Sequence, residues 1–170
     1  TKTEQGDLLQ ALFGRNGESP LPVLAPASPA ECFELAIEAF RIAVRHMTPV
    51  LILSEGFLAN SSEPWRISPF RELAPIPVRH PDEPAGFQPY SREDATLARP
   101  WVVPGTPGME HRLGGLEKHP GTGAVSYAPQ DHAASGSQDG PSALGLAERE
   151  RGAAFGPPLL RRPSRGLRVF

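Results

Sequence analysis

The stretch that decides the fold is Leu21–Ser54, LPVLAPASPAECFELAIEAFRIAVRHMTPVLILS. It opens on a short apolar run bounded by prolines, Leu21–Ala25, which indicates a strand whose first residues pair incompletely because Pro22 has no backbone donor. A helical segment is expected over Pro29–His46, and a second apolar run, Pro49–Ser54, follows at once. Strand, helix and strand in this order predict a βαβ unit with a parallel sheet and a right-handed crossover.

The helix of this unit has the best local signal in the chain. Ser28 suits the N-cap, Pro29 suits the first helical position, and Glu31 completes a capping box. Arg45 and His46 fall in the last turn, where the helix dipole favours cations. An apolar stripe is expected to form its main face, made of Phe33, Ala36, Ile37, Phe40, Val44 and Met47.

The second apolar run, Val50–Leu53, has no polar alternation, which is typical of a strand buried on both faces. Such a strand needs neighbouring strands, and this chain does not offer enough of them. We expect the missing strands to lie before Thr1. The sequence is therefore interpreted as an incomplete piece of a larger α/β protein that cannot carry out catalysis by itself.

A short helix is expected before this unit. Thr3 is a plausible N-cap, and Glu4 and Asp7 place negative charge near the positive end of the helix dipole. Gly14 ends the helix. Its apolar positions follow at helical spacing: Leu8, Leu9, Leu12 and Phe13.

Composition divides the chain into three parts. Residues 1–60 are expected to be the C-terminal part of an α/β domain, and residues 61–132 a Pro/Gly-rich extended arm or linker. The arm has ten prolines in the 44 residues from Pro64 to Pro107, which excludes long regular elements. It also carries aromatic anchors such as Trp65 and Trp101, which indicate an arm that packs against another surface.

Residues 133–170 contain six Arg, six Gly and four Pro but no Ile, Tyr or Trp. Such a segment buries too little apolar surface to offset its ordering entropy, so its simplest interpretation is a low-order, disordered tail. We favour a second interpretation, in which this segment is a translation in the wrong reading frame of a GC-rich coding region.

The overall composition excludes several classes of protein. A formal net charge of -2 gives no indication of a nucleic-acid or anionic membrane partner, and the apolar run at Pro49–Leu53 is too short to span a bilayer. Cys32 is the one cysteine, so no internal disulfide and no cysteine-based metal cluster can form. With no signal peptide in the sequence, these features favour a cytoplasmic location.

Few residues carry a chemical signal. Cys32 lies in the first turn of the main helix but has no histidine partner in sequence, so a packing role is favoured over a nucleophile. No histidine pair has the spacing of a metal site, and we predict no metal site. The loop Ser54–Gly56 follows the buried strand, where open α/β sheets bind ligands. It is either a ligand-facing loop or a simple strand exit.

Many short motifs agree in order with one family. The run from Thr1 through Lys2-Thr3-Glu4-Gln5 to Leu8-Leu9-Gln10-Ala11-Leu12-Phe13-Gly14-Arg15-Asn16-Gly17-Glu18 is followed by Ala25-Pro26-Ala27-Ser28-Pro29, Glu63-Pro64-Trp65, Ala98-Arg99-Pro100-Trp101, Pro104-Gly105-Thr106-Pro107-Gly108 and Gly114-Gly115-Leu116-Glu117-Lys118. Over about residues 1–132 the chain resembles the α subunit of 2-oxoacid:acceptor oxidoreductases, in particular the 2-oxoglutarate:ferredoxin type.

The resemblance implies the pyrimidine-side domain of a thiamine diphosphate enzyme, which decarboxylates a 2-oxoacid oxidatively to an acyl-CoA and passes electrons to ferredoxin. It implies a β subunit that carries the diphosphate side, with Mg²⁺, and a [4Fe-4S] cluster. One substrate-binding residue carries over, Thr1, whose hydroxyl is expected to face the 2-oxoacid. No catalytic residue and no cofactor-binding residue could be assigned within the chain.

Two alternatives stay open at this point. A sibling enzyme could act on pyruvate or on a branched-chain 2-oxoacid. In a different class, the chain could be a non-catalytic interaction module that docks through its proline-rich arm and arginine-rich tail.

Overall fold

A computed structural model describes residues 6–14, 21–67, 69, 73–93, 98–114 and 116–139, with side chains described as far as residue 134. Its centre is the predicted βαβ unit. Strand β1 (Val23–Leu24) leads into helix α2 (Glu31–His46), which leads into strand β2 (Leu51–Ile52). The strands are parallel, with Val23 opposite Leu51 and Leu24 opposite Ile52, which confirms the βαβ unit.

The strands are shorter than the apolar runs that contain them. Backbone bonds flank the two-residue ladder, from the Leu51 N–H to the Pro22 carbonyl at 3.0 Å and from the Leu53 N–H to the Leu24 carbonyl at 2.8 Å. Pro22 accepts a bond but has no N–H to return one, which limits the ladder at its start. Within the described ranges the sheet has these two strands and no others.

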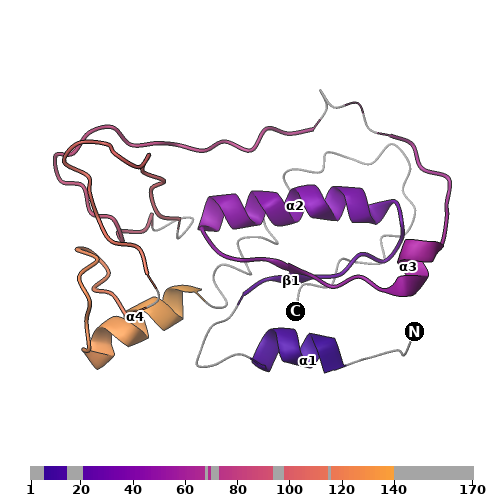
Figure 1. Cartoon of the computed structure of the whole chain (residues 1–170), viewed down its shortest axis with the longest axis horizontal. Coiled ribbons are helices and arrows are strands. Elements are labelled where there is room, and N and C mark those ends of the chain that lie inside the picture. Colours follow the sequence, from indigo (N-terminus) through magenta and orange to yellow (C-terminus); the bar gives the residue numbers. More distant parts are fainter. Residues whose placement is uncertain are drawn as a thin grey trace.

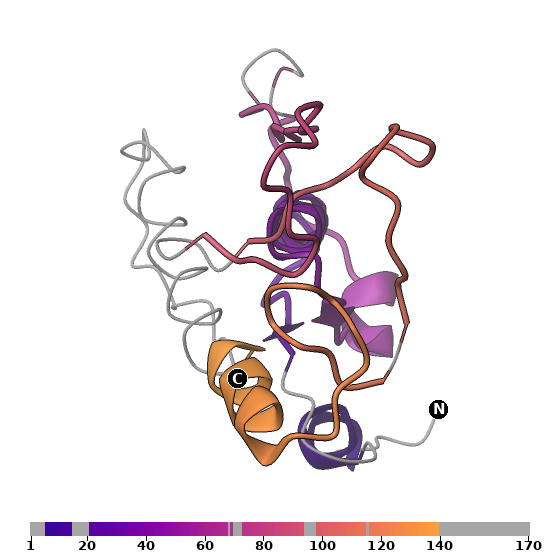
Figure 2. The same ribbon diagram turned by 90° about the vertical axis from the view of Figure 1, so that its left-hand side faces the viewer.

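Helices lie on both sides of the strands, as Figures 1 and 2 show. Helix α1 (Gly6–Phe13) is on one side and α2 on the other. The core between α2 and the sheet is a small cluster of Leu24, Leu35, Ala39 and Ile42, with Val50 packed against it. Because side chains alternate along a strand, Leu24 faces α2, and its neighbour Val23 faces the opposite side.

The start of α2 differs from the prediction, because the helix begins at Glu31 and not at Pro29, and its N-cap residue, Ala30, makes no side-chain cap bond. The Glu31 N–H donates to Ser28 Oγ at 3.4 Å, and Glu31 Oε2 accepts from the Ala27 N–H at 2.6 Å. The reciprocal pair is therefore present, displaced by one residue from the ideal capping box. At the other end Met47 is left-handed, with φ 52°, and its N–H bonds to the Ala43 carbonyl.

The predicted main face of α2 is wrong. The buried residues are Leu35, Glu38, Ala39, Ile42 and His46, whereas Phe40 is 61% exposed and Phe33 is 37% exposed. The helix carries apolar side chains on two faces. The face that packs on the sheet has Leu35, Ala39 and Ile42, whereas the face with the larger Phe33 and Phe40 side chains is more exposed. Periodicity shows that a stripe exists, but the shape of the neighbouring surface selects the stripe that is buried.

Helix α2 also buries a charged side chain. Glu38 is 5% exposed, and its carboxylate accepts a bond from Arg41 Nη1 at 2.6 Å. Arg41 also donates from Nη2 to the Ala74 carbonyl at 3.3 Å. The pairing makes burial of the carboxylate tolerable and joins α2 to the segment that follows the sheet.

Helix α1 confirms a helix in the expected place, ending at Phe13, where the Gly14 N–H bonds to the Gln10 carbonyl at 2.8 Å. The residue that it buries is Ala11, while Leu9 and Phe13 of the predicted apolar set are exposed. The proposed N-cap, Thr3, lies outside the described residues.

Strand β2 is not buried on both faces in this chain. Leu51 is 37% exposed and Ile52 is 43% exposed, whereas Val23 and Leu24 of β1 are fully buried. Within the described residues β2 has one partner strand, β1. The cover that an uninterrupted apolar run requires is therefore missing from the described part of the chain.

The proline-rich arm packs along the side of α2 that faces away from the sheet (Figure 1). Two contacts mark its course besides the bond from Arg41. The Trp65 and Phe33 rings lie 5.2 Å apart, and Trp101 Nε1 donates to the Val44 carbonyl at 2.6 Å. Between α3 (Gly56–Asn60) and α4 (Pro129–Asp139), the described residues hold only one β-bridge, Lys118 to Val125.

Helix α4 runs across the expected boundary at 132/133 and ends at Asp139. Residues 140–170, which make up most of the predicted tail, lie outside the described residues. The divisions at 60/61 and 132/133, and the reading-frame hypothesis, remain predictions.

Candidate functional site at the carboxyl edge of the sheet

Both strands of the parallel sheet end at the same edge, and a loop leaves from each. The first loop runs from Leu24 to the start of α2, and the second runs from Leu53 through α3 to Glu63. The carboxyl edge is where ligands bind in open α/β sheets. It is therefore the candidate functional site of this chain.

The first loop ends at the amino terminus of α2, where several carboxylates lie close to the helix end. The Ala30 N–H donates to Glu63 Oε1 at 2.5 Å, across 33 residues of sequence. Glu31 and Glu34 add two more carboxylates in the first turn of α2. Three negative charges at this end match the positive pole of the helix dipole, so the chain itself satisfies this terminus.

A shallow hollow of about 200 Å³ lies beside this contact. Its lining comes from the start of α2 and from the segment after α3: Pro29, Ala30, Phe33, Ser62, Glu63 and Trp65. The Trp65 and Phe33 rings form its apolar side, tilted by 55° to each other. A second hollow of about 320 Å³ lies between α1 and β2, lined by Asp7, Gln10, Ala11, Gly14, Leu51 and Leu53.

The loop singled out from the sequence, Ser54–Gly56, lies at this edge. Ser54 and Glu55 are exposed, and Glu55 is the extended residue that precedes α3 without a side-chain cap. Gly56 starts α3, and nothing lies within 4 Å of the Cβ that it lacks. The loop therefore has an exposed serine and an exposed glutamate at this edge, and its ligand-facing role stays a prediction.

Thr1, the substrate-binding residue implied by the resemblance, lies outside the described residues, so no contact can be given for it. Glu63 and Trp65 of the edge were not identified as site residues from the sequence, although both belong to the Glu63-Pro64-Trp65 motif. No local spacing links them to α2. No local sequence signal could have found them, because the bond from Ala30 to Glu63 spans 33 residues.

Cys32 is half-buried, and its thiol lies 3.6 Å from the Ser28 carbonyl, which agrees with a packing role. Within the part of the chain that the structure describes, no three His, Cys, Asp or Glu side chains gather closely enough to hold a metal ion. None of the helices in the described ranges combines the length and apolar character that crossing a bilayer takes.

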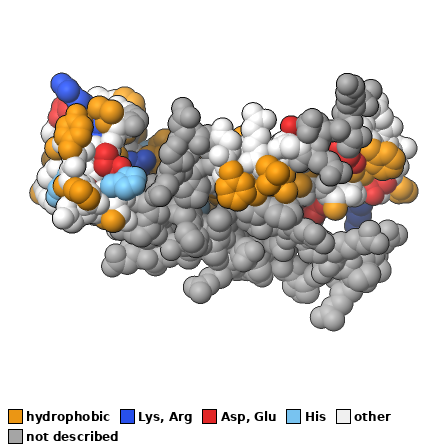
Figure 3. Space-filling model, turned by 90° about the horizontal axis from the view of Figure 1, so that it is seen from below, with side chains coloured by type: hydrophobic (Ala, Val, Ile, Leu, Met, Phe, Trp, Pro, Cys, Tyr) orange, Lys and Arg blue, Asp and Glu red, His pale blue; other side chains and the backbone are white. Residues whose placement is uncertain are grey.

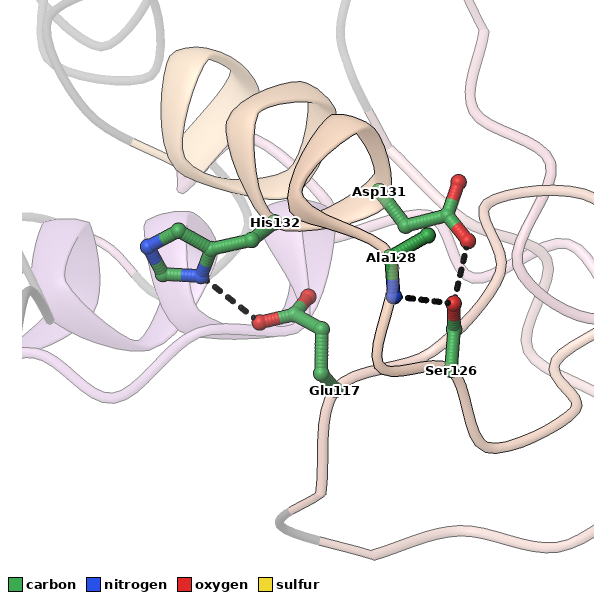
Figure 4. A network of polar contacts seen from close by, with 5 residues as sticks. All are labelled: Glu117, Ser126, Ala128, Asp131 and His132. Carbon is green, nitrogen blue, oxygen red and sulfur yellow. Dashed lines mark hydrogen bonds and ion pairs between the residues drawn. The ribbon is translucent and has the colours of Figure 1, made fainter.

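The histidines have local structural contacts. His80 Nδ1 lies 2.8 Å from the Trp101 carbonyl, and His119 Nδ1 accepts from two turn N–H groups at 3.2 Å. His132 Nδ1 lies 2.9 Å from Glu117 Oε2. In the same network Ser126 Oγ donates to Asp131 and accepts from the Ala128 N–H, at the start of α4 (Figure 4). These contacts shape the second half of the chain and lie apart from the carboxyl edge in sequence.

A parallel βαβ unit with helices on both sides and loops over its carboxyl edge defines an α/β domain of the ligand-binding type. The comparison with protein families narrows this class. Residues 1–124 match the model of the pyruvate flavodoxin/ferredoxin oxidoreductase, thiamine diphosphate-binding family, and the chain belongs to that family. The resemblance read from the short motifs is thereby confirmed.

Two curated relatives are subunits of 2-oxoglutarate enzymes. The 2-oxoglutarate oxidoreductase subunit KorA of Mycobacterium tuberculosis is 61% identical over 134 residues, which is 78% of this chain and 20% of that protein. The 2-oxoglutarate synthase subunit KorA of Archaeoglobus fulgidus is 41% identical over 73 residues, 43% of this chain and 21% of that protein. The chain thus spans about a fifth of the length of these relatives.

A solved structure supports the same fold. The 2-oxoglutarate:ferredoxin oxidoreductase from Magnetococcus marinus, with 2-oxoglutarate, coenzyme A and succinyl-CoA bound, superposes with a TM-score of 0.66 at 25% sequence identity. The match covers 91% of this chain and 26% of that one. It therefore extends well beyond the βαβ unit, and the α/β fold class is confirmed.

Proposed function

We propose that this chain is part of the α subunit of a thiamine diphosphate-dependent 2-oxoglutarate:ferredoxin oxidoreductase, which converts 2-oxoglutarate and CoA to succinyl-CoA. The observation that carries the proposal is the 61% identity over 134 residues to a 2-oxoglutarate oxidoreductase subunit. A common parallel sheet could arise in many enzymes, but this identity extends through the arm. Pyruvate or a branched-chain 2-oxoacid is the alternative substrate.

The residues at the carboxyl edge suit the pyrimidine of thiamine diphosphate better than its diphosphate. A diphosphate needs open N–H donors or cations, and the amino end of α2 is filled by Glu63 and Glu31. The apolar hollow and the exposed polar loop suit a pyrimidine-side role. The diphosphate, Mg²⁺ and the [4Fe-4S] cluster are then assigned to a β subunit, and a cytoplasmic location goes with ferredoxin as the electron acceptor.

When bound, thiamine diphosphate supplies the carbanion stabilisation that decarboxylation needs. The part of this chain is to orient and to bind. Thr1 is proposed to donate its hydroxyl proton to the carboxylate or carbonyl oxygen of the 2-oxoacid. Ser54 and Glu55 are proposed to face the same space from the end of β2.

The test uses the complete α subunit that contains this chain, purified together with its β subunit. Reduction of ferredoxin is followed with CoA and one 2-oxoacid at a time. The proposal expects reduction with 2-oxoglutarate at a kcat/KM at least about tenfold above that with pyruvate or a branched-chain 2-oxoacid, a preference of roughly 1.4 kcal/mol. Preference for pyruvate would favour the alternative, and no reduction with any 2-oxoacid would contradict the proposal.

A further inference from the structure

The two loops over the carboxyl edge are joined at both ends. At the sheet, the Leu53 N–H donates to the Leu24 carbonyl at 2.8 Å. At the far end, Glu63 Oε1 accepts from the Ala30 N–H at 2.5 Å. The segments 24–30 and 53–63 are therefore two loops that are hydrogen-bonded to each other at their first and last residues.

Between these ends the second loop is braced by its own bonds. Asn60 Nδ2 donates to the Gly56 carbonyl at 2.7 Å, and Ser61 Oγ donates to the Leu58 carbonyl at 3.2 Å. These bonds are internal to α3 and its exit, and they hold the shape of this part of the loop. The ties at the two ends attach the loop to β1 and to the start of α2.

Of the two end ties, the one at Glu63 is made by a side chain, so a substitution can remove it. It is a bond between a charged acceptor and a backbone donor at a helix amino terminus, where the dipole adds to the attraction. The Trp65 ring, two residues further along, lies 5.2 Å from the Phe33 ring, so a second contact holds the same end of the loop to α2. Without Glu63 the Ala30 N–H would lose its acceptor, and the second loop would lose its far anchor.

We propose that Glu63 is a positioning residue: its carboxylate, seated on the amino end of α2, closes the loop 53–63 over the carboxyl edge and thereby sets the place of Ser54, Glu55 and Gly56. The role is independent of the substrate that the parent enzyme uses, so it goes beyond the proposed function. Glu63 lies at the beginning of the arm, two residues before Trp65. The same residue ends the loop and starts the packing of Trp65.

The test measures local opening of this loop by proteolysis with an endoprotease that cuts after glutamate. Glu55–Gly56 is a bond inside the loop with an exposed glutamate, and Glu110–His111 is a bond in the distant arm with an exposed glutamate. The Glu63–Pro64 bond is not cut because proline follows it. The rate at Glu55 divided by the rate at Glu110, measured by mass spectrometry on the full chain, reports opening of the loop alone.

Glu63→Ala is expected to raise this ratio at least about tenfold, since a hydrogen bond to a charged acceptor is stronger than one between neutral groups. Glu63→Gln keeps an oxygen acceptor of the same reach and is expected to restore most of the protection. Glu34→Gln is the matched control, because it removes a first-turn carboxylate from α2 without touching the loop, and its ratio should stay within about twofold of the parent.

A ratio for Glu63→Ala equal to that of the parent would overturn the proposal, as would an equal rise in Glu34→Gln. If Glu63→Ala unfolds the whole chain, both bonds are cut faster and Glu63→Gln decides. A ratio for Glu63→Gln between those of the parent and of a fully open loop, with the Glu110 rate unchanged, then supports the role. A parent-like rate at Glu55 with faster cutting at Glu110 would overturn it.

Discussion

Gly123 lies in the turn between Lys118 and Val125, the two residues of the arm that form a β-bridge. Its φ is +70°, and a Cβ at this position would lie 2.5 Å from Cδ2 of Tyr90. The Gly123 N–H also bonds to the His119 carbonyl at 3.0 Å, and the Tyr90 hydroxyl donates to the Arg112 carbonyl at 3.2 Å. A single residue without a side chain thus allows two parts of the arm to meet.

This contact predicts a large cost for Gly123→Ala. The left-handed backbone alone costs about 1–2 kcal/mol for an L-residue, and displacement of the Tyr90 ring adds to it. Gly105→Ala is the matched control, because Gly105 has φ +89° but nothing within 4 Å of the missing Cβ. We expect Gly123→Ala to lower the free energy of unfolding, measured with urea, by clearly more than Gly105→Ala does. Equal losses would contradict the close approach to Tyr90.

At the scale of the elements, α2 organises the chain because it packs on two partners. Its Leu35, Ala39 and Ile42 side chains face the sheet, and the arm follows its other side. The C-terminal carbonyl of Val44 receives the Trp101 indole N–H, which satisfies one of the acceptors that a helix end leaves open. The helix is thus held by a core on one side and by a few directed contacts on the other.

This division predicts unequal costs for two substitutions in α2. Leu35→Ala removes a side chain that is 3% exposed and should cost about 2–5 kcal/mol of unfolding free energy. Phe40→Ala removes a larger side chain that is 61% exposed and should cost less than about 1 kcal/mol. Urea unfolding followed by circular dichroism measures both. A greater loss of unfolding free energy for Phe40→Ala than for Leu35→Ala would mean that the face predicted from periodicity is the buried one.

At the scale of the whole molecule, the described surface carries many large apolar side chains that are more than a third exposed. Several apolar patches are visible from below (Figure 3). Leu9, Phe13, Leu51 and Ile52 are all more than a third exposed, on α1 and on β2. Patches of this kind mark surfaces that pack against other parts of an assembly. They agree with a chain that spans about a fifth of its relatives.

The chain by itself is therefore predicted to give no turnover. Residues 1–170, mixed with a matching β subunit, thiamine diphosphate, Mg²⁺, CoA and 2-oxoglutarate, should reduce no ferredoxin above the rate without the chain. The complete α subunit under the same conditions is the positive control. Turnover by the 170-residue chain at more than a hundredth of the control rate would contradict the prediction that it cannot catalyse alone.

Several features of this protein follow from the sequence alone. Local signals, namely the Ser28 and Glu31 cap, the proline-bounded runs and the glycine stops, were enough to predict the βαβ unit and the first helix, because caps and turns act within a few residues. The ordered short motifs were enough to identify the family. The boundaries of the strands could not be predicted as well, because they depend on pairing with distant backbone. The short helix α3 was not predicted from the sequence.

The tertiary structure alone decided the face of α2 that is buried and the anchor of the carboxyl edge. Both depend on contacts between residues far apart in the chain, such as Glu63 with Ala30 and Trp101 with Val44. A helix with apolar groups on two faces has no local signal that ranks them, since burial depends on the shape of the opposing surface. A carboxylate 33 residues away leaves no periodic pattern, so its place on the helix end appears only once the chain has folded.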